Sequence, residues 1–171
     1  MMKDVLLLLM VLKAISDKTK IISIAQVSNV LGFDGPIKEI CQIAHERGII
    51  VCVDGAQSIP HEKVDVQTLD IDFLVFSGHK MCGPTGWELL YGKYRFIYKE
   101  TKPTRWGGGS NARYKSCGRI KLKNAPAKFE AGTPNIEGVI GLGAAIEYLI
   151  EIGMDNIRDY ELELRQYAVK K

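Results

Sequence analysis

The sequence lacks the cysteine spacings that mark disulfide-rich and zinc-binding proteins. Its four cysteines, Cys41, Cys52, Cys82 and Cys117, lie far apart, and no C-x-x-C pair is present. A disulfide framework or a zinc site needs more closely paired cysteines, so we expect neither, and we predict no metal site. A reducing, cytoplasmic setting fits this pattern best.

An excess of charge of one sign is also missing. The net charge is +3 in 171 residues, which is too small to indicate a nucleic-acid partner. Lysines and arginines become denser between Lys93 and Lys128, but no row of aromatic residues accompanies them. We therefore interpret that stretch as a solvated surface.

No hydrophobic run is long enough to cross a bilayer. The nearest candidate is the run from Val5 to Leu12, which has only eight apolar residues. A membrane-spanning helix needs about 20 such residues. A signal peptide is disfavoured because no small-x-small cleavage site precedes the charged run from Asp17 to Lys20. We expect a buried helix here and no membrane partner.

The composition, with 46% hydrophobic and 25% charged residues, indicates a soluble chain of roughly one domain. Apolar runs at residues 21–25 and 49–53 predict two buried strands. A helix is expected between them, beginning near Pro36 and ending at a capping Gly48. This strand, helix, strand order is typical of a parallel βαβ unit. The apolar positions of the helix are Ile37, Ile40, Cys41 and Ala44.

The second half of the chain continues the pattern with variation. Residues 73–77 predict a third buried strand and residues 87–92 a fourth, whereas residues 107–128 are expected to form a loop. A helix is predicted over residues 137–153 and a charged amphipathic helix over residues 156–171. Small residues in the first of these helices predict that a neighbouring segment packs closely against Gly141, Gly143 and Ala144.

Polar residues follow three of the predicted strands, at the edge where functional groups collect in an open α/β sheet. Taken singly, Asp54 is most simply a turn former and Lys80 a solvated side chain. Together, an aspartate that ends one strand and a lysine just past the next favour a pyridoxal phosphate (PLP) site, which needs an amine and a buried anion. The residues at the three strand ends are Ser28, Asn29, Asp54, Ser77, His79 and Lys80.

Several segments carry a resemblance to a known family. They are "QVSNVLG", "VDGAQSIPHEKVDVQTLDIDFLVFSGHKMCGPTG", "GGGS" and "FEAGTPN". From about Ala14 to Tyr167 the chain resembles the central part of a cysteine desulfurase of the SufS type, within the class V aminotransferase family. The resemblance implies an α/β fold: the three-layer large domain of a fold type I PLP-dependent transferase, truncated at both ends. Residues 1–171 would then be a partial PLP-binding large domain, with the small C-terminal domain absent.

The resemblance also implies an activity. Such enzymes are PLP-dependent transferases that act as homodimers and convert L-cysteine to L-alanine. They pass the sulfur to a cysteine of their own, and a sulfur-acceptor protein can follow in iron–sulfur cluster assembly. Selenocysteine lyase or another class V enzyme remains an alternative. An alternative of a different kind is a non-catalytic remnant or a dimerisation fragment.

Site residues transfer from the resemblance position by position. Lys80 becomes the Schiff-base lysine and catalytic base, and Asp54 becomes the catalytic partner of the pyridinium nitrogen. Asn29 and Gln57 would contact the phenolic oxygen of the cofactor ring. Ser77 and His79 would contact the phosphate of the cofactor.

The sequence departs from the family at several positions. Trp87 and Glu88 stand where the family usually has a small or aliphatic residue and a glycine, and residues 116–126 replace a threonine-containing segment. The family's sulfur-accepting cysteine is expected beyond Lys171. Cys117 lies beside two cations, which would favour a thiolate, but it matches no family motif, so we do not expect it to accept sulfur.

Overall fold

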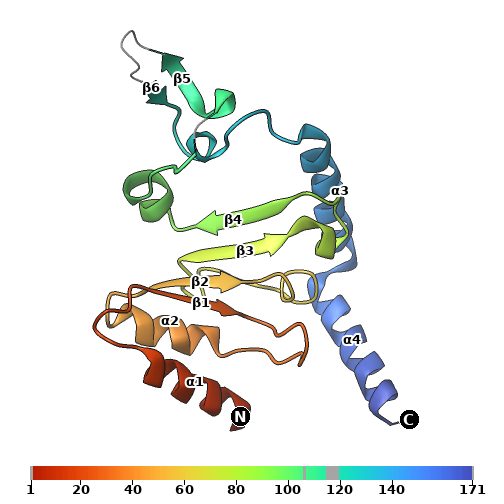
Figure 1. The fold of residues 1–171 in the computed structure, drawn as a ribbon. Helices are drawn as coiled ribbons and strands as arrows, with labels where there is room; N and C mark the ends of the chain where they lie inside the picture. The colour runs from red at the N-terminus through yellow and green to blue at the C-terminus, as the bar shows by residue number, and fades with distance from the viewer. Residues whose placement is uncertain (1, 106, 115–119, 171) are drawn as a thin grey trace. The chain divides into compact units, whose positions relative to one another are not determined.

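The computed structural model describes residues 2–105, 107–114 and 120–170 of the chain (Figure 1). Two compact units are present. The first combines Met1–Tyr91 with Gly138–Lys171, and the second is Gly92–Glu137. A four-stranded sheet belongs to the first unit and a two-stranded sheet to the second.

The four-stranded sheet has the order β1-β2-β3-β4. β1 pairs in parallel with β2, and β2 in parallel with β3. β4 runs in the opposite direction, as its arrow in Figure 1 shows. All four predicted strands are therefore confirmed. Their bounds are Ile21–Ala25, Ile50–Asp54, Phe73–Ser77 and Glu88–Gly92.

The two faces of this sheet differ in burial. One face, called here the core face, carries the buried Val51, Val53 and Leu74, because alternate strand residues point to the same side. The opposite face, called the open face, carries Cys52 and Val75, which are only half-buried. β1 lies at the sheet edge and is largely exposed, so the expectation of a buried strand at residues 21–25 is wrong for that strand's outer positions.

The core face is covered by α2 (Ile37–His45) and by the irregular segment 55–72. The predicted helix is confirmed, and its apolar positions all lie in the core. Gly48 follows the helix with φ of +67°, a conformation that costs glycine little and other residues more. The buried helix residues are the four that the spacing predicted: Ile37, Ile40, Cys41 and Ala44.

The predicted N-terminal helix is present as α1 (Met2–Ala14), but its expected burial is wrong. Leu6 is 59% exposed and Met10 is 60% exposed. A helix that is apolar on all sides needs neighbours on all sides, and the described residues supply them, chiefly from α2, on one side. No described helix is both long and apolar enough to cross a membrane.

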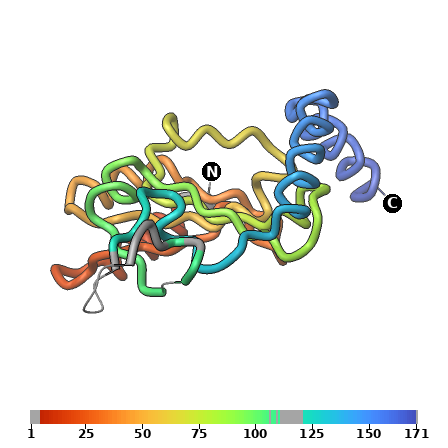
Figure 2. The backbone as a smooth tube through the Cα atoms, turned by 90° about the horizontal axis from the view of Figure 1, so that it is seen from above, coloured from red at the N-terminus to blue at the C-terminus, as the bar shows by residue number. Residues whose placement is uncertain are grey.

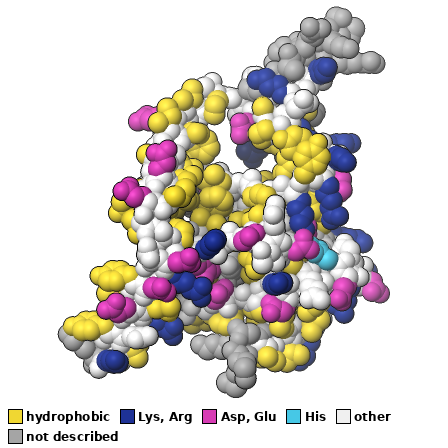
Figure 3. All heavy atoms as spheres, turned by 180° about the vertical axis from the view of Figure 1, so that it is seen from behind, with side chains coloured by type: hydrophobic (Ala, Val, Ile, Leu, Met, Phe, Trp, Pro, Cys, Tyr) yellow, Lys and Arg dark blue, Asp and Glu magenta, His cyan; other side chains and the backbone are white. Residues whose placement is uncertain are grey.

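Two helices lie at the end of the sheet toward which β1, β2 and β3 point (Figures 1 and 2). They are α3 (Ile136–Ile152) and α4 (Met154–Val169), and both predicted helices are confirmed. Leu142 and Leu149 of α3 pack with Met81 in a second apolar cluster. On their outer sides the two helices expose hydrophobic side chains, seen at the left of Figure 3.

Close packing against the small residues of α3 is confirmed at one position only. A β-carbon at Gly141 would lie 2.6 Å from Pro84 Cγ, so only a glycine fits against the Pro84 ring. At Gly143 nothing lies within 4 Å of such an atom, and Ala144 is exposed. The prediction is wrong at these two positions because they lie on the outer side of the helix.

The second unit contains an antiparallel pair of strands, β5 (Asn111–Tyr114) and β6 (Ile120–Leu122). The expectation that residues 107–128 form only a loop is therefore wrong. Strands of four and three residues are too short to show a clear alternation in the sequence. Cys117, which we considered as a sulfur acceptor, lies outside the described residues.

Candidate functional site

The side chain at the carboxyl end of β2 is Asp54. In the strand register it lies between Ala25 of β1 and Val75 of β3. It is exposed, and its Oδ1 atom accepts a hydrogen bond of 2.9 Å from the Ala56 N–H. By strand alternation Asp54 and Ser77 both belong to the open face. The carboxylate is therefore accessible and its orientation is fixed by its own turn.

That turn is held tightly against the sheet. The Gly55 N–H donates to the Val75 carbonyl at 2.8 Å. A β-carbon at Gly55 would lie 2.8 Å from Leu74 Cδ1, so any side chain here would have to displace the end of that leucine. The position of Asp54 is consequently set by core packing.

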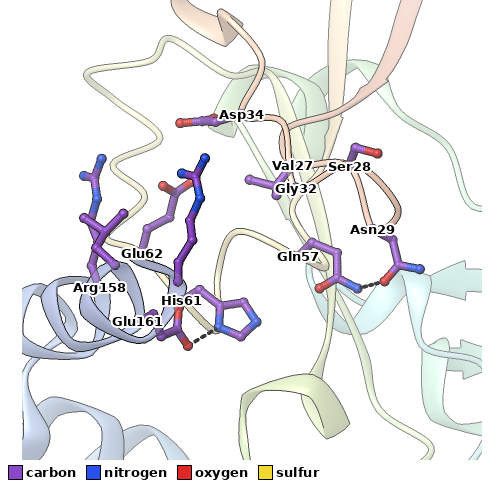
Figure 4. Close-up of a pocket in the computed structure, with 12 residues that line it drawn as sticks. Val27, Ser28, Asn29, Gly32, Asp34, Gln57, His61, Glu62, Arg158 and Glu161 are labelled. Atoms are coloured by element: carbon purple, nitrogen blue, oxygen red, sulfur yellow. Dashed lines mark hydrogen bonds and ion pairs between the residues drawn. The ribbon is translucent and has the colours of Figure 1, made fainter. Parts of the chain in front are cut away.

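The amides of Asn29 and Gln57 lie side by side. Gln57 follows the Asp54 turn, and its Nε2 group donates a hydrogen bond to Asn29 Oδ1, drawn as a dashed line in Figure 4. Asn29 belongs to the loop after β1. The sequence grouped these two residues by resemblance, and the structure brings them together from positions 28 residues apart.

Lys80 and His79 lie on a short 3₁₀ turn, Gly78–Met81, that directly follows β3. Both side chains are exposed, whereas Gly78 and Met81 are buried. The Gly83 N–H closes the turn by donating to the Gly78 carbonyl at 3.0 Å. The turn therefore presents its lysine and histidine outward from a fixed base.

Packing against α3 fixes the base of the same turn. A β-carbon at Gly83 would lie 2.8 Å from the Gly78 carbonyl oxygen and 2.9 Å from Leu142 Cδ1. Glycine is required at this point because the turn touches both itself and the helix. The Lys80 turn is thus anchored to the rest of the first unit.

Ser77 has a partner that the sequence did not predict. Its hydroxyl donates a hydrogen bond of 2.7 Å to Glu88 Oε2, on the neighbouring strand β4. Glu88 was noted as a departure from the family, but its position next to Ser77 follows only from the pairing of β3 with β4.

A cleft of about 540 Å³ lies next to the Asn29–Gln57 pair. Figure 4 shows this pair on one side of the cleft and Arg158 and Glu161 of α4 on the other. Two of the six residues predicted to form the site, Asn29 and Gln57, therefore line the cleft. The other four, Asp54, Ser77, His79 and Lys80, are placed at the same edge of the sheet but not among the cleft-lining residues.

Comparison with known proteins decides the family. The family model described as aminotransferase class-V matches residues 4–171. The chain belongs to the class-V aminotransferase family. A probable cysteine desulfurase of Halalkalibacterium halodurans is 53% identical over 159 residues, and a cysteine desulfurase of Shigella sonnei is 48% identical over 155 residues. These alignments cover 93% and 91% of this chain, which spans only 39% and 38% of the length of those relatives.

Solved structures agree with this assignment. The apo cysteine desulfurase of Thermococcus onnurineus matches with a TM-score of 0.84 and 41% identity, over 88% of this chain and 38% of that one. The Escherichia coli cysteine desulfurase CsdA in its S-sulfonic acid form matches with a TM-score of 0.81 and 41% identity, over 86% of this chain and 36% of that one. The predicted α/β fold of a class-V aminotransferase is confirmed.

Sequence reasoning about this class-V chain missed a polar network behind the cleft. The side chain of Gln26 donates to Glu62 Oε1 at 3.0 Å and accepts from the buried Ser58 hydroxyl at 2.8 Å. Burial, and then the nearby Asp34 carboxylate, raise the pKa of Glu62 above its usual range. The only signal in the sequence was the polar character of the stretch after Gln57.

A hydrogen-bonded contact between two cleft-lining residues was also missed. His61 Nδ1 lies 2.7 Å from Glu161 Oε1, a contact shown as a dashed line in Figure 4. The two residues are 100 positions apart, so no local pattern could join them. The contact joins α4 to the loop after β2 across the surface of the cleft.

Cys52 lies on the open face, two residues before Asp54. Burial, and then the Asp54 carboxylate, raise the pKa of this thiol above its usual value. Cys52 is therefore protonated at neutral pH, which makes it a poor nucleophile. Among the described residues, no group of three or more His, Cys, Asp or Glu side chains could hold a metal ion.

Proposed function

We propose that the chain is part of a PLP-dependent cysteine desulfurase of the SufS type. One observation carries the proposal: a carboxylate, an amide pair and an exposed lysine are fixed at one edge of one sheet. Asp54 comes from β2, the Asn29–Gln57 pair from the loops after β1 and β2, and Lys80 from the turn after β3. The names of the matched relatives support the same assignment.

The donor set matches the ring of PLP in chemical type, although Asp54 is exposed rather than the buried anion that was expected. Asp54 uses Oδ1 for its own turn, and among the described residues Oδ2 receives no hydrogen bond, so a pyridinium N–H could be accepted there. The Asn29–Gln57 contact consumes one amide hydrogen and leaves others for a phenolic oxygen. The amine of Lys80 is exposed and forms no ion pair within the described part of the chain.

The residues have distinct tasks in this proposal. PLP, when bound, supplies an electron sink that stabilises negative charge on the substrate carbon. Asp54 holds the proton on the ring nitrogen that this role requires. Lys80 would hold the cofactor through Nζ, and its amine would move a proton to and from the substrate carbon as a general base and acid. The amide pair would orient the ring, and Ser77 and His79 would contact the phosphate.

The reaction assigned here is the conversion of L-cysteine to L-alanine, with sulfur passed to an enzyme cysteine and then to an acceptor in iron–sulfur cluster assembly. We further propose a cytoplasmic homodimer in which residues 1–171 form part of the large domain. Because Cys52 keeps its proton at neutral pH, we do not assign it as the sulfur acceptor.

Reductive labelling of the chain with PLP and borohydride tests the proposal. We expect visible absorbance on adding PLP and, after reduction, a pyridoxyl group on Lys80 in peptide mass spectrometry. Lys80→Ala removes both signals. Lys38→Ala, which removes an exposed lysine from α2, is the matched control and leaves them intact. Labelling spread over several lysines and unchanged in Lys80→Ala would show that the assignment is wrong.

A further inference from the structure

The contact between Ser77 and Glu88 is built into the sheet. The two residues lie on adjacent strands, and the Ser77 hydroxyl donates to Glu88 Oε2 at 2.7 Å. The Gly78 N–H donates to the Trp87 carbonyl at 2.9 Å, which fixes the backbones on either side of the pair. A β-carbon at Gly78 would lie 3.3 Å from Trp87 Cβ, so the two segments are closely packed. The strand pairing therefore keeps the Glu88 carboxylate, although exposed, within hydrogen-bonding reach of the Ser77 hydroxyl.

This contact changes what Ser77 can offer to a ligand. A serine hydroxyl has one proton to donate, and in this structure that proton is directed at Glu88. A phosphate oxygen only accepts, so it must displace the carboxylate to receive this hydrogen bond. The same carboxylate also repels a phosphate placed nearby, because like charges at short range raise the free energy of the bound state.

No neighbouring cation cancels the charge of Glu88. Within the described ranges, no lysine, arginine or histidine forms an ion pair with it, and its side chain accepts a hydrogen bond from Ser77 alone. His79 and Lys80 lie on the turn that follows Ser77, and both side chains are exposed. The negative charge thus lies beside the hydroxyl to which the proposed function assigns the cofactor phosphate.

We propose that Glu88 is a specificity-determining residue that competes with the phosphate of the cofactor for the Ser77 hydroxyl. This inference rests on the proposed function, which places the phosphate beside Ser77. Its consequence is a chain that gains little affinity from the phosphate: it discriminates weakly between PLP and pyridoxal, the same ring with a neutral hydroxymethyl group. Removing the charge of Glu88 restores that discrimination.

The decisive experiment measures the dissociation constants of PLP and pyridoxal for the parent chain and for Glu88→Gln. We expect the variant to bind PLP about tenfold more tightly or better, the scale of a hydrogen bond to a charged group, with the pyridoxal constant unchanged. Glu46→Gln, which removes one carboxylate from an exposed position just after α2, is the matched control and changes neither constant. Far-ultraviolet circular dichroism confirms that each variant is folded.

A double-mutant cycle with Ser77→Ala links the effect to the hydroxyl. Because Glu88 occupies the hydroxyl in the parent, Ser77→Ala should weaken PLP binding more in the Glu88→Gln background than in the parent. Equal losses in both backgrounds, or equal PLP-to-pyridoxal ratios in parent and Glu88→Gln, would overturn the role of Glu88. If Lys80 is still labelled in that case, the proposed function stands without it. Absence of Lys80 labelling by both ligands in every variant overturns both proposals.

Discussion

The two faces of the four-stranded sheet have similar apolar composition but different surroundings. On the core face, Val51, Val53 and Leu74 are covered by α2 and by segment 55–72. On the open face, Cys52 and Val75 are half-buried and lead to Asp54 and Ser77 at the strand ends. A continuous apolar strand is typical of a sheet covered on both sides, and only one side is covered by the described residues.

Because of this difference, the core face contributes mainly to the stability of the fold, whereas the open face carries residues of the candidate site. The core face supplies hydrophobic burial and holds the strands in register. The open face receives little of that burial, and it is the face to which the strand alternation assigns Asp54 and Ser77. Substitutions on the two faces should therefore affect different measurements, and adjacent residues of one strand provide the comparison.

The largest expected effect is at Leu74, whose side chain is 2% exposed. Leu74→Ala should lower the free energy of unfolding by about 2–5 kcal/mol, the range for removing a buried leucine side chain. Val75→Ala, at the next residue but on the open face, should cost about 1 kcal/mol or less because less area is lost. Urea denaturation of both variants measures the difference. Equal losses would show that the open face is covered after all.

An intermediate effect is expected at two glycines of α3. One of them packs closely against a neighbouring segment and the other has open space around it, so they compare a covered with an uncovered position on one helix. Replacing glycine by alanine inside a helix gains about 1 kcal/mol at either position. At Gly143, where there is open space, Gly143→Ala should show that gain. At Gly141 the added carbon meets Pro84, and overpacking of this kind costs about 1–3 kcal/mol.

Thermal unfolding of the two glycine variants therefore isolates the contact with Pro84, because the helix propensity gain is common to both. We expect Gly141→Ala to melt below Gly143→Ala. Since Pro84 lies in the loop just after the Lys80 turn, Gly141→Ala should also weaken pyridoxal labelling of Lys80. If the two variants melt at the same temperature, the close approach of α3 to that loop is not present in solution.

The smallest effect concerns the thiol of Cys52 on the open face. Its raised pKa means that alkylation by iodoacetamide is slow at neutral pH and accelerates as the pH rises toward that pKa, because only the thiolate reacts. Asp54→Asn removes one of the two causes and should increase the rate at pH 8 severalfold. The exposed Cys82 serves as the reference in the same sample. An unchanged ratio of the two rates would mean that Asp54 does not act on Cys52.

The sequence predicted the strands, α2 and the terminal helices well, because each is indicated by the spacing of apolar residues within its own segment. The positions of Asp54 and Lys80 near strand ends were predictable for the same reason: Asp54 directly follows one continuous apolar run, and Lys80 lies four residues after another. What failed was burial beyond the local element, as in α1, on the outer side of α3 and along the edge strand β1. Burial on those sides depends on neighbours that no local pattern specifies.

The polar contacts of the site were the least predictable part. Resemblance grouped Asn29 with Gln57, but the pairs Ser77–Glu88 and His61–Glu161 join elements whose proximity is a property of the folded chain. The hairpin of β5 and β6 was missed because its strands are too short to carry a pattern. Contacts of this kind can be predicted only when the order and pairing of the strands and helices are already known.

The close approach of Gly55 to Leu74 has an evolutionary consequence. Leu74 is a core residue and Gly55 directly follows Asp54, yet a single methyl group at position 55 would lie 2.8 Å from the leucine side chain. A side chain at position 55 would have to displace the end of the Leu74 side chain, and Ser58 Oγ and Ile59 Cγ1 lie close by at 3.2 and 3.3 Å. We therefore expect changes in the packing around Leu74 to shift the turn that carries Asp54, so that the core and the candidate site do not evolve independently.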